Sequence, residues 1–307
     1  MELELVSDGL RFPEGPLVLR DGSVVFCQMM SGTLSRRHPD GTISTIADVG
    51  GGPNGAAIGS DGAVYVANNG GVSFTMVGDV AFGGHQHPDY IGGRIQRVTL
   101  DGEVTDLYVE GDRGPLRGPN DLIFDGHGGF YFTDSGKIRE QDLDHGTLYY
   151  AARDGSSITS VVHPLAAPNG VGLSPDGSRL YVSETMTGRL WYWDVEAPGR
   201  LTGGSQPFTP GGGTLLHGFG GYTGLDSLAV DSHGNVNVGT LFHGSVSTIA
   251  PDGRLVGQVG LGLDPFFTNI TFGGPELTTA YITGSGHGRL YRATWPVPGL
   301  PPAFEAG

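Results

Sequence analysis

Residues 168–185 read PNGVGLSPDGSRLYVSET: a polar start at Pro168-Asn169-Gly170, a short apolar strand, an Asp176-Gly177 turn and a second alternating strand. Asp-Gly between two alternating segments is a strong hairpin signal, and it favours a type I′ turn with positive φ at both central residues. The same unit occurs six times in the chain. The other five copies begin at Pro13, Pro53, Pro119, Leu225 and Thr268.

Each unit continues beyond this hairpin. Most copies add a third strand, another turn containing Asp-Gly and a fourth strand; these further turns lie at Asp40, Asp101, Asp154 and Asp252. Four antiparallel strands repeated roughly every 50 residues are typical of propeller blades. We therefore predict an all-β fold, a six-bladed β-propeller formed by residues 1–307 as one domain. The alternating segment 2–6 is expected to pair with the last blade and close the ring.

The spacing between the second and third copies is too long for a simple connection. It contains an insertion at residues 72–93, which includes FGGHQHPDYIGG. Long insertions of this kind in compact domains are commonly functional loops. We expect a rim loop or lid at the mouth of the tunnel, on the face of Glu14 and Asp226, with Gly83-Gly84 and Gly92-Gly93 as hinges. Residues 138–144 form the only stretch with the potential for a helical turn.

Composition excludes several classes of partner. The chain has 17 basic and 32 acidic residues, a net charge of −15, and Lys137 as its only lysine. Nucleic acids and anionic membranes both require clustered cations, so neither is an expected partner. Residues 1–8 show no secretory signal, and the apolar runs are strand-length. The single cysteine, Cys27, excludes an internal disulfide and is expected to be a buried strand residue. We expect a cytoplasmic location.

One position of the repeat is always polar. In a propeller the first strand of each blade lines the central channel, so equivalent residues converge on the axis. This position holds Glu14, Asn54, Asn120, Asn169, Asp226 and Asn269. Pro-Asn-Gly is also a good turn sequence, but that explanation does not account for Glu14, because glutamate is a poor turn residue. We therefore predict a functional ring of oxygen-bearing side chains.

Two carboxylates and four carboxamides suit a hard divalent cation. Calcium accepts six to eight oxygen ligands, including carboxylates and amide carbonyls. Zinc normally recruits His or Cys, and neither occupies the ring. We expect one Ca²⁺ ion, with Mn²⁺, Fe²⁺, Zn²⁺ and Mg²⁺ as alternatives.

Five segments resemble the gluconolactonase and regucalcin (senescence marker protein) family of six-bladed propellers, and more distantly diisopropyl fluorophosphatase. They are FPEGP at 12–16, RGPNDL at 117–122, and residues 167–185, 225–238 and 268–283. The resemblance covers nearly the whole chain. It implies a single divalent metal at the tunnel mouth bound through Glu14, Asn169 and Asp226. Asn120 would be either a fourth ligand or a contact to substrate and water, and Arg117 matches a substrate-binding arginine.

These observations predict a metal-dependent hydrolase that opens a lactone, a sugar lactone or similar cyclic ester. Asp226 is the candidate general base, although a metal-bound carboxylate is a weak base, which keeps metal-bound hydroxide and direct attack by Asp226 as alternatives. Asn54, Asn269, His85 and His87 are candidate substrate contacts. Two other functions stay open: phosphotriester hydrolysis on the same ring, and a non-catalytic binding propeller with a structural metal. Asp134 and Glu184 are expected to cap turns, with contact to substrate as the alternative.

Overall fold

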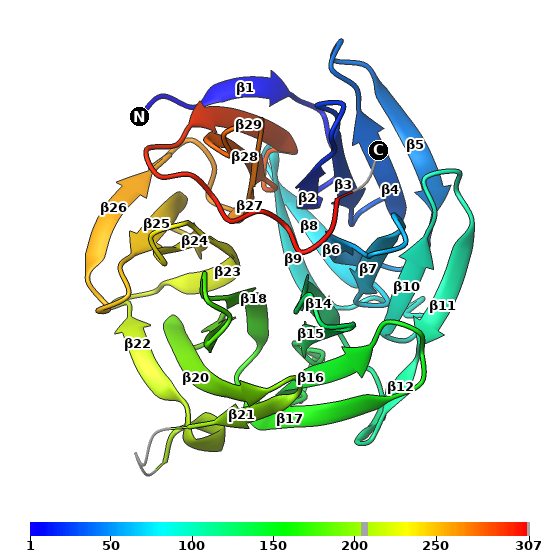
Figure 1. Cartoon of the computed structure of the whole chain (residues 1–307). Helices are drawn as coiled ribbons and strands as arrows, with labels where there is room; N and C mark the ends of the chain where they lie inside the picture. Colours follow the sequence, from blue (N-terminus) through cyan, green and yellow to red (C-terminus); the bar gives the residue numbers. More distant parts are fainter. Residues whose placement is uncertain (204–207, 306–307) are drawn as a thin grey trace.

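A computed structural model describes residues 1–203 and 208–305. Six antiparallel sheets surround a central axis, as Figure 1 shows, and each sheet is one blade. The first strand of each blade lies nearest the axis and contacts the first strands of the two neighbouring blades. The predicted six-bladed β-propeller is confirmed.

The first three blades contain the following strands, from the axis outward. Blade 1 consists of β2 (Pro13–Val18), β3 (Val24–Gln28), β4 (Thr33–Arg37) and β5 (Ile43–Asp48). Blade 2 consists of β6 (Pro53–Ile58), β7 (Val64–Asn68), β10 (Arg94–Val98) and β11 (Val104–Tyr108). Blade 3 consists of β14 (Pro119–Phe124), β15 (Gly129–Asp134), β16 (Gly146–Ala152) and β17 (Ile158–Leu165). A short hairpin of β12 (Glu110–Gly111) and β13 (Gly114–Pro115) joins blades 2 and 3.

The remaining blades follow the same plan. Blade 4 consists of β18 (Pro168–Leu173), β19 (Arg179–Glu184) and β20 (Arg189–Ala197), with β21 (Arg200–Thr202) and β22 (Thr214–Gly218) both paired to β20. Blade 5 consists of β23 (Gly224–Val230), β24 (Val236–Leu241), β25 (Ser245–Ile249) and β26 (Leu255–Val259). Blade 6 consists of β27 (Phe267–Gly273), β28 (Thr279–Gly284), β29 (Arg289–Thr294) and β1 (Glu4–Ser7).

The N-terminal strand closes the ring as predicted. β1 is the outer strand of blade 6, with Glu4 opposite Arg292 and Leu5 opposite Tyr291, and Figure 1 shows it beside β29. Its bounds are shifted from the expected 2–6 to 4–7. The last blade thus combines three strands from the end of the chain with one strand from its beginning. This pairing covers the edge of β29, which would otherwise be unpaired.

The Asp-Gly turns differ from the expected type I′ turns. Asp21 lies outside the left-handed region, and only Gly22 has a positive φ, of +82°. Leu19 N–H donates to Ser23 O at 2.9 Å, and Gly22 N–H donates to Leu19 O at 2.9 Å. This is the three-residue loop in which a type I turn is followed by a left-handed glycine. Asp21 Oδ1 accepts the N–H of Ser23 at 3.0 Å, which explains the aspartate.

The apolar core lies between adjacent blades. Each of six buried clusters joins two neighbours; the cluster between blades 1 and 2, for example, contains Cys27, Leu34, Ile58 and Val66. Cys27 is fully buried there, as expected for a strand residue. The strict alternation of each strand places one face toward each neighbouring blade, so every blade needs both neighbours.

The insertion is a β-hairpin rather than an irregular loop. β8 (Val72–Val77) pairs with β9 (Val80–Gln86). Gly83 is paired with Phe74 inside this ladder, so the Gly83-Gly84 pair is part of a strand and not a hinge between segments. Residues 138–144 form no helix, only an isolated bridge between Ile138 and Leu143. Within the described part of the chain, no helix is long and apolar enough to cross a membrane.

Candidate metal and substrate site

The first strand of every blade carries a β-bulge at the predicted ring position. Pairing with the second strand shifts register there in all six blades. In blade 3, for example, Pro119 pairs with Asp134 and the next paired residue is Leu122, so Asn120 and Asp121 lie between them. Bulges redirect side chains at the rims of barrels and next to sites. The bulge therefore explains how consecutive polar residues come to lie at the axis.

All six ring residues are buried, with exposed fractions between 2% for Glu14 and 9% for Asn120. Three of their oxygen atoms have no hydrogen-bond partner: Glu14 Oε2, Asn54 Oδ1 and Asn120 Oδ1. Burying a polar atom without a partner costs about 1–3 kcal/mol, so native proteins rarely leave such atoms unsatisfied. Three unpartnered acceptors at one ring indicate a position for a ligand that supplies positive charge.

Three carboxylates share this space. Burial, together with the charges of Asp226 and Asp121, raises the pKa of Glu14 well above its usual value. Burial raises the pKa of Asp226 to about 7, and the charge of Asp121 adds to the increase. Burial likewise raises the pKa of Asp121 to about 7. The ring is therefore a poorly solvated concentration of negative charge.

Asn169 and Asp226 are held in fixed orientations by their neighbours. Asp226 Oδ1 accepts the N–H of Ser227 at 3.0 Å. Ser227 Oγ donates to Asn169 Oδ1 at 3.3 Å, and Asn169 Nδ2 donates to Thr185 Oγ1 at 3.1 Å. These contacts orient Asn169 Oδ1 toward Ser227. Asp226 has only Oδ1 bonded to Ser227, so its Oδ2 is available to other partners.

Side chains at the ends of the second strands support the segments that lead into the ring. Asp134 accepts the N–H groups of Arg117 and Gly118, both at 2.7 Å. Glu184 Oε1 accepts the N–H of Ala166 at 2.8 Å. The predicted turn-capping roles of Asp134 and Glu184 are thus confirmed. Each cap fixes the two or three residues before a ring asparagine.

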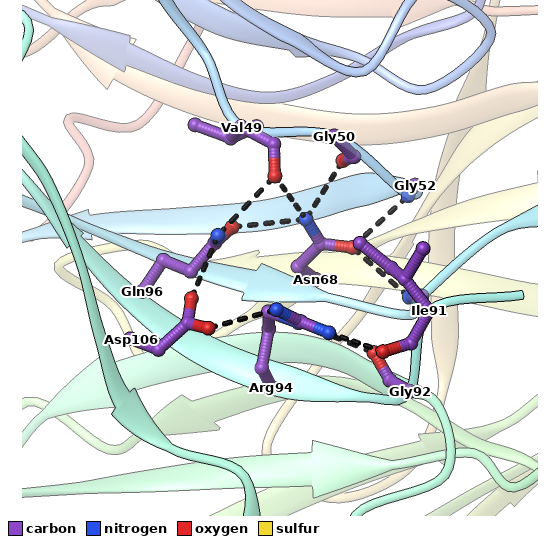
Figure 2. Close-up of polar contacts among 10 residues, drawn as sticks. Val49, Gly50, Gly52, Asn68, Ile91, Gly92, Arg94, Gln96 and Asp106 are labelled. Atoms are coloured by element: carbon purple, nitrogen blue, oxygen red, sulfur yellow. Dashed lines mark hydrogen bonds and ion pairs between the residues drawn. The ribbon is translucent and has the colours of Figure 1, made fainter.

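Blade 2 uses an extended polar network for the same purpose, shown in Figure 2. Asn68 Oδ1 accepts the N–H of Gly52 at 3.0 Å and of Gly70 at 2.9 Å. Its Nδ2 donates to Gly50 O and to Gln96 Oε1, both at 2.9 Å. Because Gly52 precedes Pro53-Asn54 and Gly70 precedes the hairpin, one asparagine positions both the Asn54 segment and the root of β8.

The other end of the insertion is held by the same network (Figure 2). Asp106 accepts hydrogen bonds from Gln96 Nε2 at 3.0 Å and from Arg94 Nη1 at 2.7 Å. Arg94 in turn donates to Gly92 O at 3.3 Å and to Ile91 O. Both ends of residues 72–93 are therefore fixed to blade 2 by polar contacts, which are buried at the first end and partly exposed at the second.

The hairpin crosses the mouth of the tunnel on the ring face. The second strand of each blade ends beside the start of the first, as Asn68 does beside Pro53, and the hairpin follows β7 directly. It extends past blade 1, where Phe74 contacts Phe12, to blade 6, where Ala81 N–H donates to Gly286 O at 2.8 Å. Figure 1 shows β8 and β9 running across the central region.

The remaining predicted substrate contacts lie on this face but outside the ring. Arg117 is exposed and stands three residues before Asn120. His85 is exposed on β9, and His87 follows the strand with its Nδ1 accepting the N–H of Asp89 at 3.0 Å. Gln86 between them bonds to Ile138 of blade 3. The two histidines therefore lie near blades 2 and 3, away from the hairpin turn at blade 6.

A cation is consistent with the donor set. Among residues 1–203 and 208–305, no three His, Cys, Asp or Glu side chains form a metal-binding group by themselves. A site here therefore has to include the amide oxygens of asparagine, which calcium accepts readily. The unpartnered oxygens of Glu14, Asn54 and Asn120 fit that requirement.

The predicted ring has one residue per blade and therefore does not include Asp121. Asp121 follows Asn120 within the same bulge and is 6% exposed. A side-chain carbon on Gly55 would lie 2.5 Å from Asp121 Oδ1, so residue 55 must be glycine for the carboxylate to fit. The signal in the sequence was the consecutive pair Asn120-Asp121, which the other copies lack.

A cavity of about 500 Å³ lies along the axis beside the first strands of the blades. Asp121 and Asn269 line its upper part, and Leu300 to Ala303 of the C-terminal segment line its opposite end. Gly299 pairs with Asp231 and bonds to Leu277 O, which fixes this segment across blades 5 and 6. Figure 1 shows the segment in red, passing in front of the blades.

Comparisons with known proteins agree with the fold. Residues 12–286 match the family model described as SMP-30/Gluconolactonase/LRE-like region. The chain is 30% identical over 260 residues to "Lactonase drp35" of Staphylococcus saprophyticus, covering 84% of this chain and 72% of that protein.

Two solved structures share the fold. A gluconolactonase from Xanthomonas campestris superposes with a TM-score of 0.73 at 22% identity, covering 97% of this chain and 89% of that one. The calcium-binding protein regucalcin from Agrobacterium tumefaciens gives 0.77 at 18% identity, covering 99% and 96%. At these identities the superpositions show the fold alone. With the family model matching nearly the whole chain, this six-bladed propeller belongs to the SMP-30/gluconolactonase/LRE-like family.

Proposed function

We propose that this chain is a divalent-metal-dependent hydrolase that opens a lactone ring at the mouth of its central tunnel. The observation that carries the proposal is the set of buried, unpartnered oxygens of Glu14, Asn54 and Asn120 beside the carboxylate of Asp226. Such a set is costly unless a cation and a polar substrate occupy it. The staphylococcal relative named as a lactonase supports the reaction class.

The ring residues would hold the ion and orient the substrate. The proposed ligands are Glu14, Asn120, Asn169 and Asp226. A bound divalent cation would polarise the lactone carbonyl and stabilise the negative charge that develops on its oxygen. Ca²⁺ is the proposed ion, since the donors are all oxygen and include amides; the calcium-binding neighbour regucalcin has the same fold.

Asp226 is the proposed general base. Hydrolysis bonds the oxygen of water to the carbonyl carbon, breaks the bond from that carbon to the ring oxygen and yields a hydroxy acid. Asp226 has one oxygen fixed by Ser227 N–H, so the other is available to accept the proton of water and return it to the ring oxygen. Burial raises the pKa of Asp226 to about 7, which favours proton acceptance, whereas a neighbouring cation lowers it.

The substrate side of the site is proposed to include Arg117, Asn54 and Asn269, with His85 and His87 contributing from the hairpin. Arg117 is the nearest exposed cation before Asn120 along the chain. A guanidinium there would attract the carboxylate product and the polarised carbonyl.

The test compares charge-removing variants of the two ring carboxylates. Glu14→Gln and Asp226→Asn each remove one negative charge with little change of shape. Each should weaken Ca²⁺ affinity by at least about tenfold, because affinity for hard cations depends on ligand charge. Lactone hydrolysis should fall in both, and excess Ca²⁺ should restore Glu14→Gln more than Asp226→Asn. The measurements are equilibrium metal content and turnover of a lactone panel at saturating metal.

Asn269→Ala is the control for metal binding, because Asn269 is a ring residue outside the proposed ligand set; its metal content should equal that of the unmodified protein. Full metal occupancy and unchanged turnover in both carboxylate variants would contradict the proposal. Turnover of a phosphotriester with none of any lactone would assign the ring to phosphotriester hydrolysis instead. Retained metal without turnover of either class would indicate a binding propeller.

A further inference from the structure

A row of four aromatic rings borders the tunnel mouth, and nothing in the ring chemistry accounts for it. The aromatic row consists of Phe82 on β9, Phe266 before β27, Phe242 after β24 and Tyr222 before β23. Phe82 and Phe266 lie edge to face with centroids 5.0 Å apart, and Phe242 follows Phe266 at 5.9 Å. Tyr222 stacks on Phe242 at 4.3 Å.

Three of these rings face solvent. Tyr222 is 78% exposed, Phe242 39% and Phe82 36%. Exposing contiguous aromatic surface is unfavourable, and patches of this kind mark binding sites. The elements that carry them come from three places in the chain: the hairpin, blade 5 and the start of blade 6.

The row lies beside the segment that leads into the ring. A side-chain carbon on Gly224 would lie 3.3 Å from Cε2 of Phe242, and Gly224 is two residues before Asp226. The same position would lie 3.4 Å from the methyl group of Thr185, whose hydroxyl accepts Asn169 Nδ2. Phe242 therefore borders the segment that carries Asp226 and lies near Thr185, the residue that orients Asn169.

The backbone holds the row in place at a conformational cost. Phe242 has a φ of +70°, a left-handed conformation that bulky residues rarely adopt. Its N–H donates to Pro265 O at 2.8 Å. The fully buried Asp264 accepts the N–H of Phe266 at 2.8 Å and of His287 at 2.9 Å. Strained residues that surrounding contacts keep fixed cluster at functional sites.

We propose that the aromatic row binds an apolar alkyl or aryl substituent on the lactone, so that the enzyme prefers substituted lactones to polyhydroxylated sugar lactones. This inference rests on the proposed lactonase activity and specifies its substrate. Phe82, Phe242 and Phe266 offer no polar atom, so the row cannot satisfy the several hydroxyl groups of a sugar. Spaced at 4.3–5.9 Å, the rings form a platform for a chain of several carbons or for an aryl ring.

The first experiment measures kcat/KM for γ-butyrolactone, γ-hexalactone, γ-octalactone and γ-phenyl-γ-butyrolactone, with D-glucono-1,5-lactone for comparison, at saturating Ca²⁺. Each methylene that becomes buried should raise kcat/KM up to about fourfold. Phe242→Ala, Phe82→Ala and Tyr222→Ala should remove most of this gain, with a loss of at least about tenfold on γ-octalactone and less than about twofold on γ-butyrolactone. Phe208→Ala, which changes an exposed ring between β21 and β22 of blade 4, is the matched control and should leave the series unchanged.

A second experiment separates failure of this inference from failure of the lactonase proposal. Calorimetry measures binding of 2-heptylcyclopentanone, a ketone that cannot be hydrolysed, to the unmodified protein and to Tyr222→Ala. Weaker ketone binding in Tyr222→Ala supports the aromatic row as a site for an apolar substituent, whichever reaction the protein catalyses. Two results together would contradict the proposed role of the aromatic row: lactone turnover that does not depend on chain length, and unchanged ketone binding in Tyr222→Ala. The lactonase proposal would still stand. A dimer in sedimentation that Tyr222→Ala dissociates would assign the rings to a contact between copies and overturn the inference as well.

Discussion

Asp121 brings a third buried carboxylate to the ring, and its effect is electrostatic. Its charge contributes to the raised pKa of both Glu14 and Asp226. Its own pKa is raised to about 7 by burial. In the unfolded chain an aspartate titrates near pH 4. Between about pH 4 and pH 7 the folded protein therefore binds more protons at Asp121 than the unfolded chain does, so this group makes the free energy of unfolding fall as pH rises through that window.

Replacing Asp121 by asparagine tests this sign. In the absence of cation, Asp121→Asn should raise Tm relative to the unmodified protein at pH 8, because the native carboxylate is ionised there. At pH 4.5 the substitution should change Tm little, because that carboxylate is protonated in the folded protein. Thermal unfolding at the two pH values, with a chelator present, makes the measurement. Asp252→Asn is the control, because Asp252 lies in an exposed turn and its carboxylate pairs with Arg254. A lower Tm for Asp121→Asn at pH 8 would contradict the electrostatic interpretation.

Lys137 connects the β8–β9 hairpin to blade 3. Lys137, in the loop after β15, is 3% exposed and donates from Nζ to Asn69 Oδ1 at 3.2 Å and to Gly71 O at 3.0 Å. The next residue, Ile138, accepts the N–H of Gln86 at the end of β9 at 2.8 Å. Blade 3 therefore fixes the root of β8 and the end of β9 at once. Burial lowers the pKa of Lys137 to about 7, so the protein retains this lysine despite an energetic cost of charging it.

Lys137→Met should loosen the hairpin while leaving the blades intact. Asn69 Oδ1 and Gly71 O each lose one hydrogen bond and keep another, from the N–H groups of Gly71 and His87, and each lost bond costs about 0.5–1.5 kcal/mol. Hydrogen–deuterium exchange of the amides in β8 and β9 should accelerate by at least about tenfold. Amides of β24 in blade 5 provide the internal control and should not change. Ca²⁺ affinity should also be retained, since no ring residue is altered. Equal exchange of the hairpin amides in both proteins would show that the contacts of Lys137 do not anchor the hairpin.

At the scale of the whole molecule, stability depends on closing the ring. Every blade shares apolar clusters with both neighbours, and blade 6 takes its outer strand from the N-terminus. Loss of β1 would expose the edge of β29 and the apolar residues that Leu3 and Val6 help to cover. The expected effect is a loss of stability that extends to blades 1 and 6 together.

Deleting residues 1–7 should therefore lower Tm by on the order of 5–10 °C, from the loss of two apolar side chains and one strand pairing. Glu4→Ala is the matched control. It removes only the exposed ion pair with Arg292, at 2.8 Å, and such pairs contribute at most about 1 kcal/mol. Differential scanning calorimetry measures both variants. Equal Tm values for the deletion and for Glu4→Ala would refute a structural role for ring closure.

The six repeats, the four strands per blade and the closing strand were all predicted from the sequence. The hairpins and blades depend on interactions within a few residues, whereas the closing strand was predicted because the last blade would otherwise keep an unpaired edge. Asp-Gly turns and period-two alternation specify each hairpin, and repetition specifies the blades. The alternation also assigned Cys27 to a buried strand, and the caps at Asp134 and Glu184 followed from their place at strand ends. The burial of all six ring positions follows from the repeat in the same way, because equivalent positions converge on the axis.

Only the tertiary structure decided what surrounds the ring. Asp121 shares a bulge with Asn120, and a bulge is not visible in an alternating pattern. The glycines of the insertion are typical of a loop, so the sequence did not predict the pairing of β8 with β9. Contacts with blades 1, 3 and 6 stabilise this pairing. The aromatic row and the buried Lys137 combine residues that are far apart in the chain, Phe82 with Phe266 and Lys137 with Asn69. Local sequence sets turns and strands, whereas contacts between distant segments depend on how the blades close around the axis.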